Sequence, residues 1–255
     1  MFLHGRENYR RNADLVCYTF YKNIIFSLPQ FFFGFYSAFS GQTLYEKVMH
    51  QMFNVAFTGA PIVWYAIMDR EFEKPKFLEK LVDAKLYKTG IKNEKFTVFV
   101  FWYWILKGVM EAYLIIVLFT STQGLDPSNI KGRMIGHWVA GMFCFGTVEF
   151  CANWTIFMMT HNFTGYGEAI IFASAFSYFP LIALMAQNPE FSEVYKFLSE
   201  SVTCVQAYFC CFMMFFVAAA GPRIKQRLFQ VYQLFTETHK EHEEEHSGIK
   251  YKEEI

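Results

Sequence analysis

Long apolar blocks constrain this chain more than any other feature of its sequence. Of the 255 residues, 54% are hydrophobic and 32 are Phe. The apolar residues come in blocks of about 17 to 25, the length that a helix needs to cross the hydrocarbon core of a bilayer. Only 18% of the residues are charged, against about a quarter in a soluble domain. We therefore expect an all-α fold, a polytopic membrane bundle of about six transmembrane helices.

The apolar blocks also define the expected domain organisation. The expected spans are residues 15–36, 48–68, 96–120, 137–159, 169–185 and 205–220. We expect a cytosolic stalk segment at 1–14, a six-helix membrane domain at 15–221 and a cytosolic polar tail at 222–255.

The distribution of charge predicts the orientation of these spans. Net charge is zero, so no overall field favours nucleic acid as a partner. Most of the 23 Lys and Arg fall in residues 1–14, 69–95 and 222–255, and such segments stay on the cytosolic side. We expect an integral membrane protein with both termini cytosolic. The six cysteines lie in or beside apolar blocks without metal-ligand spacing, so no metal site is predicted.

Three acidic or basic side chains stand in the third and fourth spans, where charge is costly. Lys107 and Glu111 are one helical turn apart and can neutralise each other. Glu149 lies near the middle of the fourth span. It could accept a hydrogen bond from a neighbouring helix or carry a proton, and the sequence leaves both alternatives open.

Lys22 has no acidic residue within one turn. It adjoins Asn23 in a span that also contains Pro29, a residue that frees a backbone carbonyl. A cation, an amide and a loosened backbone predict a polar pocket that could hold an ion or a lipid headgroup. The alternative, a lysine that extends to the nearby membrane surface, stays open.

Several motifs in register resemble the membrane region of the P4 class of P-type ATPases, the phospholipid flippases. They are HGRENYRR (4–11), FYKN (20–23), FSGQ (39–42), FNVAFT with a following proline (53–61) and LYKTG (86–90). In that family these segments run from the start of the fifth transmembrane helix to the seventh, so the chain is similar to helices five to ten. The departures are Ser37 where the family often has Asn, Met68-Asp69-Arg70 in place of FDQ, and the charges of Lys107 and Glu111.

The resemblance implies a flippase that moves aminophospholipid from the exoplasmic to the cytosolic leaflet. It places Lys22, Asn23, Ser37, Asn54 and Thr58 along the lipid path. An ammonium and amides can replace water around a phosphate or a serine carboxylate. It also implies a glycoprotein β-subunit with two spans as partner, and residence in the plasma membrane or in Golgi and endosomal membranes.

The DKTGT, DGET and GDGxND motifs of the family's catalytic domains do not occur in these 255 residues. We therefore expect no cofactor in this chain, with ATP and Mg²⁺ bound by domains outside it, and no catalysis by the chain alone. A fragment, a partial gene model and a truncated paralogue all agree with this. The alternative function is a free-standing six-helix scaffold or regulatory protein without ATPase activity.

Overall fold

The computed structural model describes residues 5–70, 95–124, 137–161 and 164–188. All regular elements in these ranges are helices, so the predicted all-α class is confirmed. Three segments are long and apolar enough to span a membrane: Val98–Thr120, His137–Met159 and Gly165–Gln187. The expected sixth span and the polar tail lie outside the described residues.

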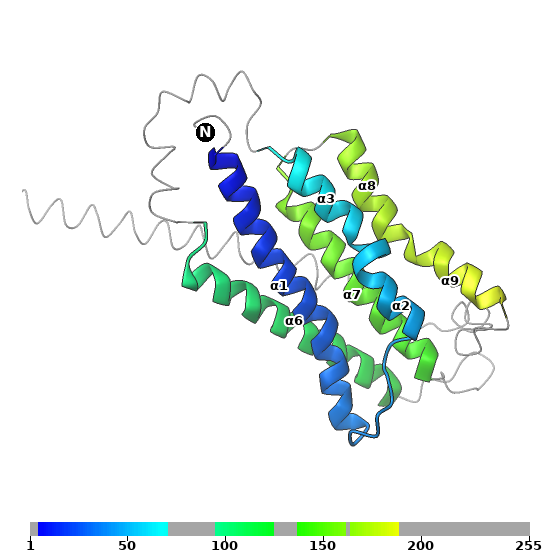
Figure 1. Ribbon diagram of the computed structural model, residues 1–255. Coiled ribbons are helices and arrows are strands. Elements are labelled where there is room, and N and C mark those ends of the chain that lie inside the picture. Colours follow the sequence, from blue (N-terminus) through cyan, green and yellow to red (C-terminus); the bar gives the residue numbers. More distant parts are fainter. Residues whose placement is uncertain (1–4, 71–94, 125–136, 162–163, 189–255) are drawn as a thin grey trace, which may run out of the picture. The chain divides into compact units, whose positions relative to one another are not determined.

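Helix α1 (Gly5–Tyr36) runs without interruption through the expected boundary between stalk and membrane (Figure 1). It begins before the predicted start at Leu15 because charged residues one turn apart support its first turns. Arg10 pairs with Glu7 and Asp14 on the same face, an arrangement that stabilises helices. The residues of the expected stalk and of the expected first span therefore belong to one continuous helix.

The end of α1 is set by backbone geometry. Ala38 and Phe39 adopt positive φ angles of 50° and 54°, and the Phe39 amide donates to the Gly34 carbonyl at 2.8 Å. This bond closes the helix as in a Schellman motif. Gln30 then ties the following loop back to α1, since its side-chain oxygen accepts from the Leu44 amide at 2.7 Å.

The second expected span, 48–68, is broken into three pieces and is not one continuous helix. They are α2 (Lys47–Met52), a π-helix η1 (Phe53–Phe57) and α3 (Gly59–Met68). Pro61 has no amide hydrogen to donate to the carbonyl of Phe57, four residues earlier. π-Helices are rare overall, and those that occur often lie at functional sites. This segment is therefore a candidate for part of a functional site.

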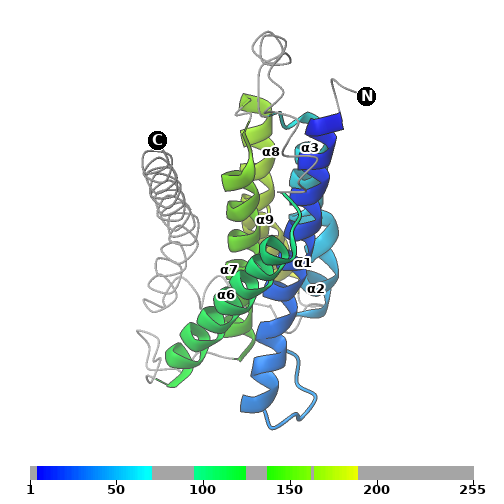
Figure 2. The same ribbon diagram turned by 90° about the vertical axis from the view of Figure 1, so that its left-hand side faces the viewer.

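The remaining spans are α6 (Val98–Gly124), α7 (His137–Met159) and the pair α8 (Gly165–Phe176) and α9 (Tyr178–Gln187). The boundaries predicted for α7 are confirmed. The fifth expected span is interrupted at Ser177, because Pro180 cannot donate to the carbonyl of Phe176. Helix α6 crosses α1 (Figures 1 and 2), where Gly108 lets Ile24 approach closely.

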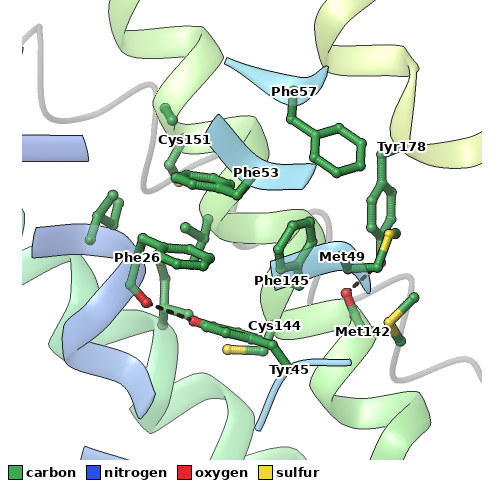
Figure 3. Packing of buried hydrophobic residues seen from close by; sticks show 14 of the residues in the cluster. Phe26, Tyr45, Met49, Phe53, Phe57, Met142, Cys144, Phe145, Cys151 and Tyr178 are labelled. Carbon is green, nitrogen blue, oxygen red and sulfur yellow. Dashed lines mark hydrogen bonds between the residues drawn. The ribbon is translucent and has the colours of Figure 1, made fainter. Parts of the chain in front are cut away.

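Aromatic rings fill the core around the π-helix (Figure 3). Phe26 of α1 stacks on Phe53 with ring centroids 4.2 Å apart. Phe145 of α7 meets Phe57 edge to face at 5.5 Å and stacks with Tyr178 of α9. Rings of η1 thus lie between α1 and α7, and the irregular segment is held by packing on both sides.

Candidate functional site

Lys22 points into the protein beside the break between η1 and α3. Its residue is 5% exposed, and its ammonium donates to the Thr58 hydroxyl at 3.2 Å. Thr58 in turn donates to the Phe53 carbonyl at 2.9 Å. Within the described ranges no carboxylate pairs with Lys22. The Phe53 ring centroid also lies 5.9 Å from the ammonium. A buried cation held by one neutral hydroxyl and an aromatic ring retains capacity to bind an anionic group.

The carbonyl that Pro61 leaves free is bound by side chains of two other helices. Asn153 of α7 donates to the Phe57 carbonyl at 3.0 Å, and the Ser174 hydroxyl of α8 donates to the same oxygen. Asn153 also donates to the carboxylate of Glu149 at 2.6 Å. Among the described residues, the Glu149 carboxylate therefore accepts from its own helix, one turn away, and from no neighbouring helix. This network fixes the position of the π-helix.

Lys107 and Glu111 form the ion pair that their spacing predicts, with 3.6 Å between ammonium and carboxylate. Tyr21 of α1 donates a short hydrogen bond to Glu111, and Lys107 donates to Thr155 of α7 at 3.0 Å. The Lys107 ammonium also lies 4.1 Å from the centre of the Tyr21 ring. The pair therefore joins α1, α6 and α7. Its contact on α1 is Tyr21, the residue that directly precedes Lys22.

Among the described residues, Asn23, Ser37 and Asn54, the other residues predicted for the lipid path, do not contact the Lys22 ammonium, and their place in the path stays a prediction. Asn23 and Asn54 are exposed. Consecutive residues on a helix point about 100° apart, so Asn23 faces away when Lys22 faces inward. Ser37 lies beyond the end of α1 and donates to the Gly34 carbonyl at 3.3 Å. Only Lys22 and Thr58 of the predicted path residues are brought into contact.

A buried charged cluster that the sequence analysis did not identify lies where α1 begins and α3 ends (Figure 1). We call it the Arg10 cluster, and its members are Glu7, Arg10, Asp14, Tyr65, Asp69 and His161. Arg10 is 2% exposed and donates to Asp69 at 2.8 Å. It also donates to the Tyr65 hydroxyl at 3.3 Å and lies 3.1 Å from the His161 ring.

Part of this cluster was open to prediction. Glu7, Arg10 and Asp14 share one helical face by their spacing, which predicts local pairing. The partner Asp69 is 59 positions away from Arg10, and no local sequence pattern predicts a contact between residues so far apart. The described residues contain no group of His, Cys, Asp and Glu that could hold a metal ion.

The geometry is that of a membrane bundle with a buried cation beside an irregular helix, and comparison with known proteins identifies its family. The family model described as "Phospholipid-translocating P-type ATPase C-terminal" matches residues 1–235. The chain belongs to this family.

Relatives extend the same conclusion. The chain is 31% identical over 181 residues to "Phospholipid-transporting ATPase IH" of Mus musculus, covering 70% of this chain and 15% of that protein. It is 27% identical over 235 residues to "Probable phospholipid-transporting ATPase 5" of Arabidopsis thaliana, covering 90% of this chain and 19% of the relative. The chain thus matches less than a fifth of the length of these relatives. It is an integral membrane protein and corresponds to the C-terminal membrane region of a P4-ATPase.

Proposed function

We propose that this chain is the membrane portion of an ATP-driven flippase that moves aminophospholipid from the exoplasmic to the cytosolic leaflet, and that Lys22 and Thr58 form part of the lipid path. The observation that carries the proposal is the buried ammonium of Lys22, hydrogen-bonded to the Thr58 hydroxyl beside a π-helix. A phosphate or serine carboxylate would provide the charged acceptor that this ammonium lacks among the described residues.

The role of the break follows from the same chemistry. An irregular backbone inside a membrane is tolerated where other protein groups satisfy it or where it lines a polar route. Asn153 and Ser174 satisfy the Phe57 carbonyl from one side, which leaves Thr58 directed to Lys22 on the other. The break therefore presents a hydroxyl and an ammonium together, while Asn23 and Asn54, which are exposed, would contact a headgroup only outside this buried contact.

The remaining parts of the proposal concern the complete protein. ATP and Mg²⁺ would bind domains outside these 255 residues, so that this chain is not catalytic by itself. A two-span glycoprotein β-subunit is the proposed partner. Both termini would be cytosolic, in the plasma membrane or in Golgi and endosomal membranes. The names of the relatives, phospholipid-transporting ATPases, support only the ATP-driven transport of phospholipid in this proposal.

The test compares Lys22→Ala and Lys22→Met with the exposed control Lys47→Ala in the complete protein reconstituted in phosphatidylserine-containing vesicles. A hydrogen bond to a charged group contributes about 1.5–3 kcal/mol, so we expect about a 10- to 150-fold rise in the phosphatidylserine concentration that half-maximally stimulates ATP hydrolysis. Lys47→Ala removes the same charge from an exposed position and should leave the value unchanged. Unaltered lipid stimulation in both Lys22 variants would rule out the assigned role.

The size of the natural polypeptide separates the flippase from the free-standing alternative. An antibody against the chain should detect a band several times larger than the 30.0 kDa of these residues. A band near 30 kDa in the cell of origin would exclude ATP-driven transport by this polypeptide alone and support the scaffold function.

A further inference from the structure

Glu149 is a buried carboxyl group in the membrane-spanning helix α7, and the proposed lipid path does not use it. Its residue is 1% exposed, so bulk water does not solvate the carboxyl. Among the described residues, no Lys, Arg or His forms an ion pair with it, and its one hydrogen-bond donor is the neutral side-chain amide of Asn153. An ionised carboxylate in an apolar interior without a compensating charge is so unfavourable that such a group generally takes up a proton instead.

Glu111 of α6 shows what an ionised carboxylate in this bundle requires. It is buried as well, but the Lys107 ammonium lies 3.6 Å from its carboxylate and Tyr21 donates a short hydrogen bond to it. The positive charge and the donor both favour the ionised form. Glu149 has neither a cation nor a hydroxyl donor among the described residues. Two buried carboxyl groups in such different surroundings hold different charge states.

The polar groups around Glu149 are also one hydrogen short. The side-chain nitrogen of Asn153 lies 3.0 Å from the Phe57 carbonyl and 2.6 Å from the Glu149 carboxyl, and 3.2 Å from the Glu149 backbone carbonyl. Its two hydrogens are therefore fully used. The side-chain oxygen of Asn153 is buried and has no hydrogen-bond donor among the described residues. A buried acceptor left without a donor is unfavourable.

Hydroxyl groups from two other helices reach this part of α7, and both donate to backbone carbonyls. Ser174 of α8 donates to the Phe57 carbonyl. Tyr18 of α1 donates to the Ala152 carbonyl at 3.2 Å. Each hydroxyl has a single hydrogen, so neither can supply the hydrogen that the Asn153 oxygen lacks. The carboxyl of Glu149 becomes a donor only when it carries a proton.

We propose that Glu149 and Asn153 form a proton-binding site, in which Glu149 is a neutral carboxylic acid whose hydroxyl donates to the Asn153 side-chain oxygen. The two residues are four apart on α7, so their side chains face each other. The bound proton removes the unpaired charge and supplies the missing hydrogen together. Asn153 then donates one hydrogen back to the acid and keeps the other for the Phe57 carbonyl of the π-helix. This site does not depend on the proposed role of Lys22.

Infrared spectroscopy of the complete protein in detergent at neutral pH tests the charge directly. A neutral carboxylic acid has a carbonyl stretch well separated from the two bands of a carboxylate, and it shifts in D₂O. The difference between the wild type and Glu149→Gln should show the loss of one acid band and no loss of carboxylate bands. Glu111→Gln is the matched control and should lose carboxylate bands, because Glu111 pairs with Lys107.

Thermal unfolding of the same variants tests the hydrogen bonds. For a membrane region that unfolds as one unit, Glu149→Gln should leave the midpoint within about 2 °C of the wild type, because an amide is neutral and has both the donor and the acceptor of the acid. The same change at Glu111 leaves Lys107 unpaired and should lower the midpoint by about 6 °C or more. Glu149→Leu removes both bonds to Asn153 and should lower it by several degrees. If Glu149→Leu does not accumulate, the two Gln variants decide the test.

Three results would overturn the proton site. Loss of carboxylate bands in Glu149→Gln would mean that Glu149 is ionised. Bands of Glu149 that move when K⁺ replaces Na⁺ would mean that a metal cation, and not a proton, neutralises it. A fall in the midpoint of Glu149→Gln as large as that of Glu111→Gln would mean that a charge was lost. Each result leaves the proposed function standing, since that is tested by the lipid stimulation of the Lys22 variants.

Discussion

The buried ion pair of Lys107 and Glu111 gives the sharpest energetic prediction. The two side chains are 11% and 8% exposed, so neither charge can be hydrated by bulk water. Lys107→Met and Glu111→Gln each leave the other charge buried, which costs about 3–5 kcal/mol. The double variant leaves no charge and should recover at least half of either loss.

The surroundings support the size of this effect. Besides Glu111, the Lys107 ammonium contacts the Thr155 hydroxyl and the rings of Tyr21 and Trp104, which are uncharged. These groups offset part of the desolvation, since a cation over a ring gains about 0.5–2 kcal/mol. They do not replace a carboxylate.

The assay is the thermal unfolding midpoint of the complete protein in detergent. For a membrane region that unfolds as one unit of 150–250 residues, one kcal/mol corresponds to about 2–4 °C, so each single variant should lower the midpoint of that transition by about 6 °C or more. Tyr21→Phe, which removes one donor from Glu111, should lose less than either. If the losses of Lys107→Met and Glu111→Gln add up in the double variant, the two charges are stabilised independently and the reasoning is refuted.

Two smaller predictions concern the packing around the break and the loop. Asn153→Leu removes a donor from the Phe57 carbonyl and should lower the free energy of unfolding by about 1–3 kcal/mol; Ser174→Ala, which leaves Asn153 in place, should cost less, and equal losses would contradict the ranking. Gly141→Ala places a methyl group 2.1 Å from the Leu44 carbonyl oxygen, so it should lower the thermal midpoint by several degrees, whereas an unchanged midpoint would mean that the loop moves away freely.

Local sequence rules predicted a good part of the fold. The His137–Met159 helix was predicted to its ends, because a membrane span is defined by its apolar length and by polar residues on either side. The Lys107–Glu111 pair was predicted as well, since residues four apart on a helix always face each other. Pro61 was visible in the second span, but its consequence, a π-helix held by Asn153 and Ser174, depends on two distant helices.

The sequence by itself therefore determined the class of protein, its family motifs, the positions of most spans and the contacts within one helix, all of which depend on neighbours along the chain. Only the tertiary structure decided that Lys22 turns toward Thr58 while Asn23 turns outward, and that Arg10 meets Asp69 from 59 positions away. The rotation of one helix against another depends on how their side chains pack. Hydropathy does not encode this packing, because nearly every face of a membrane helix is apolar.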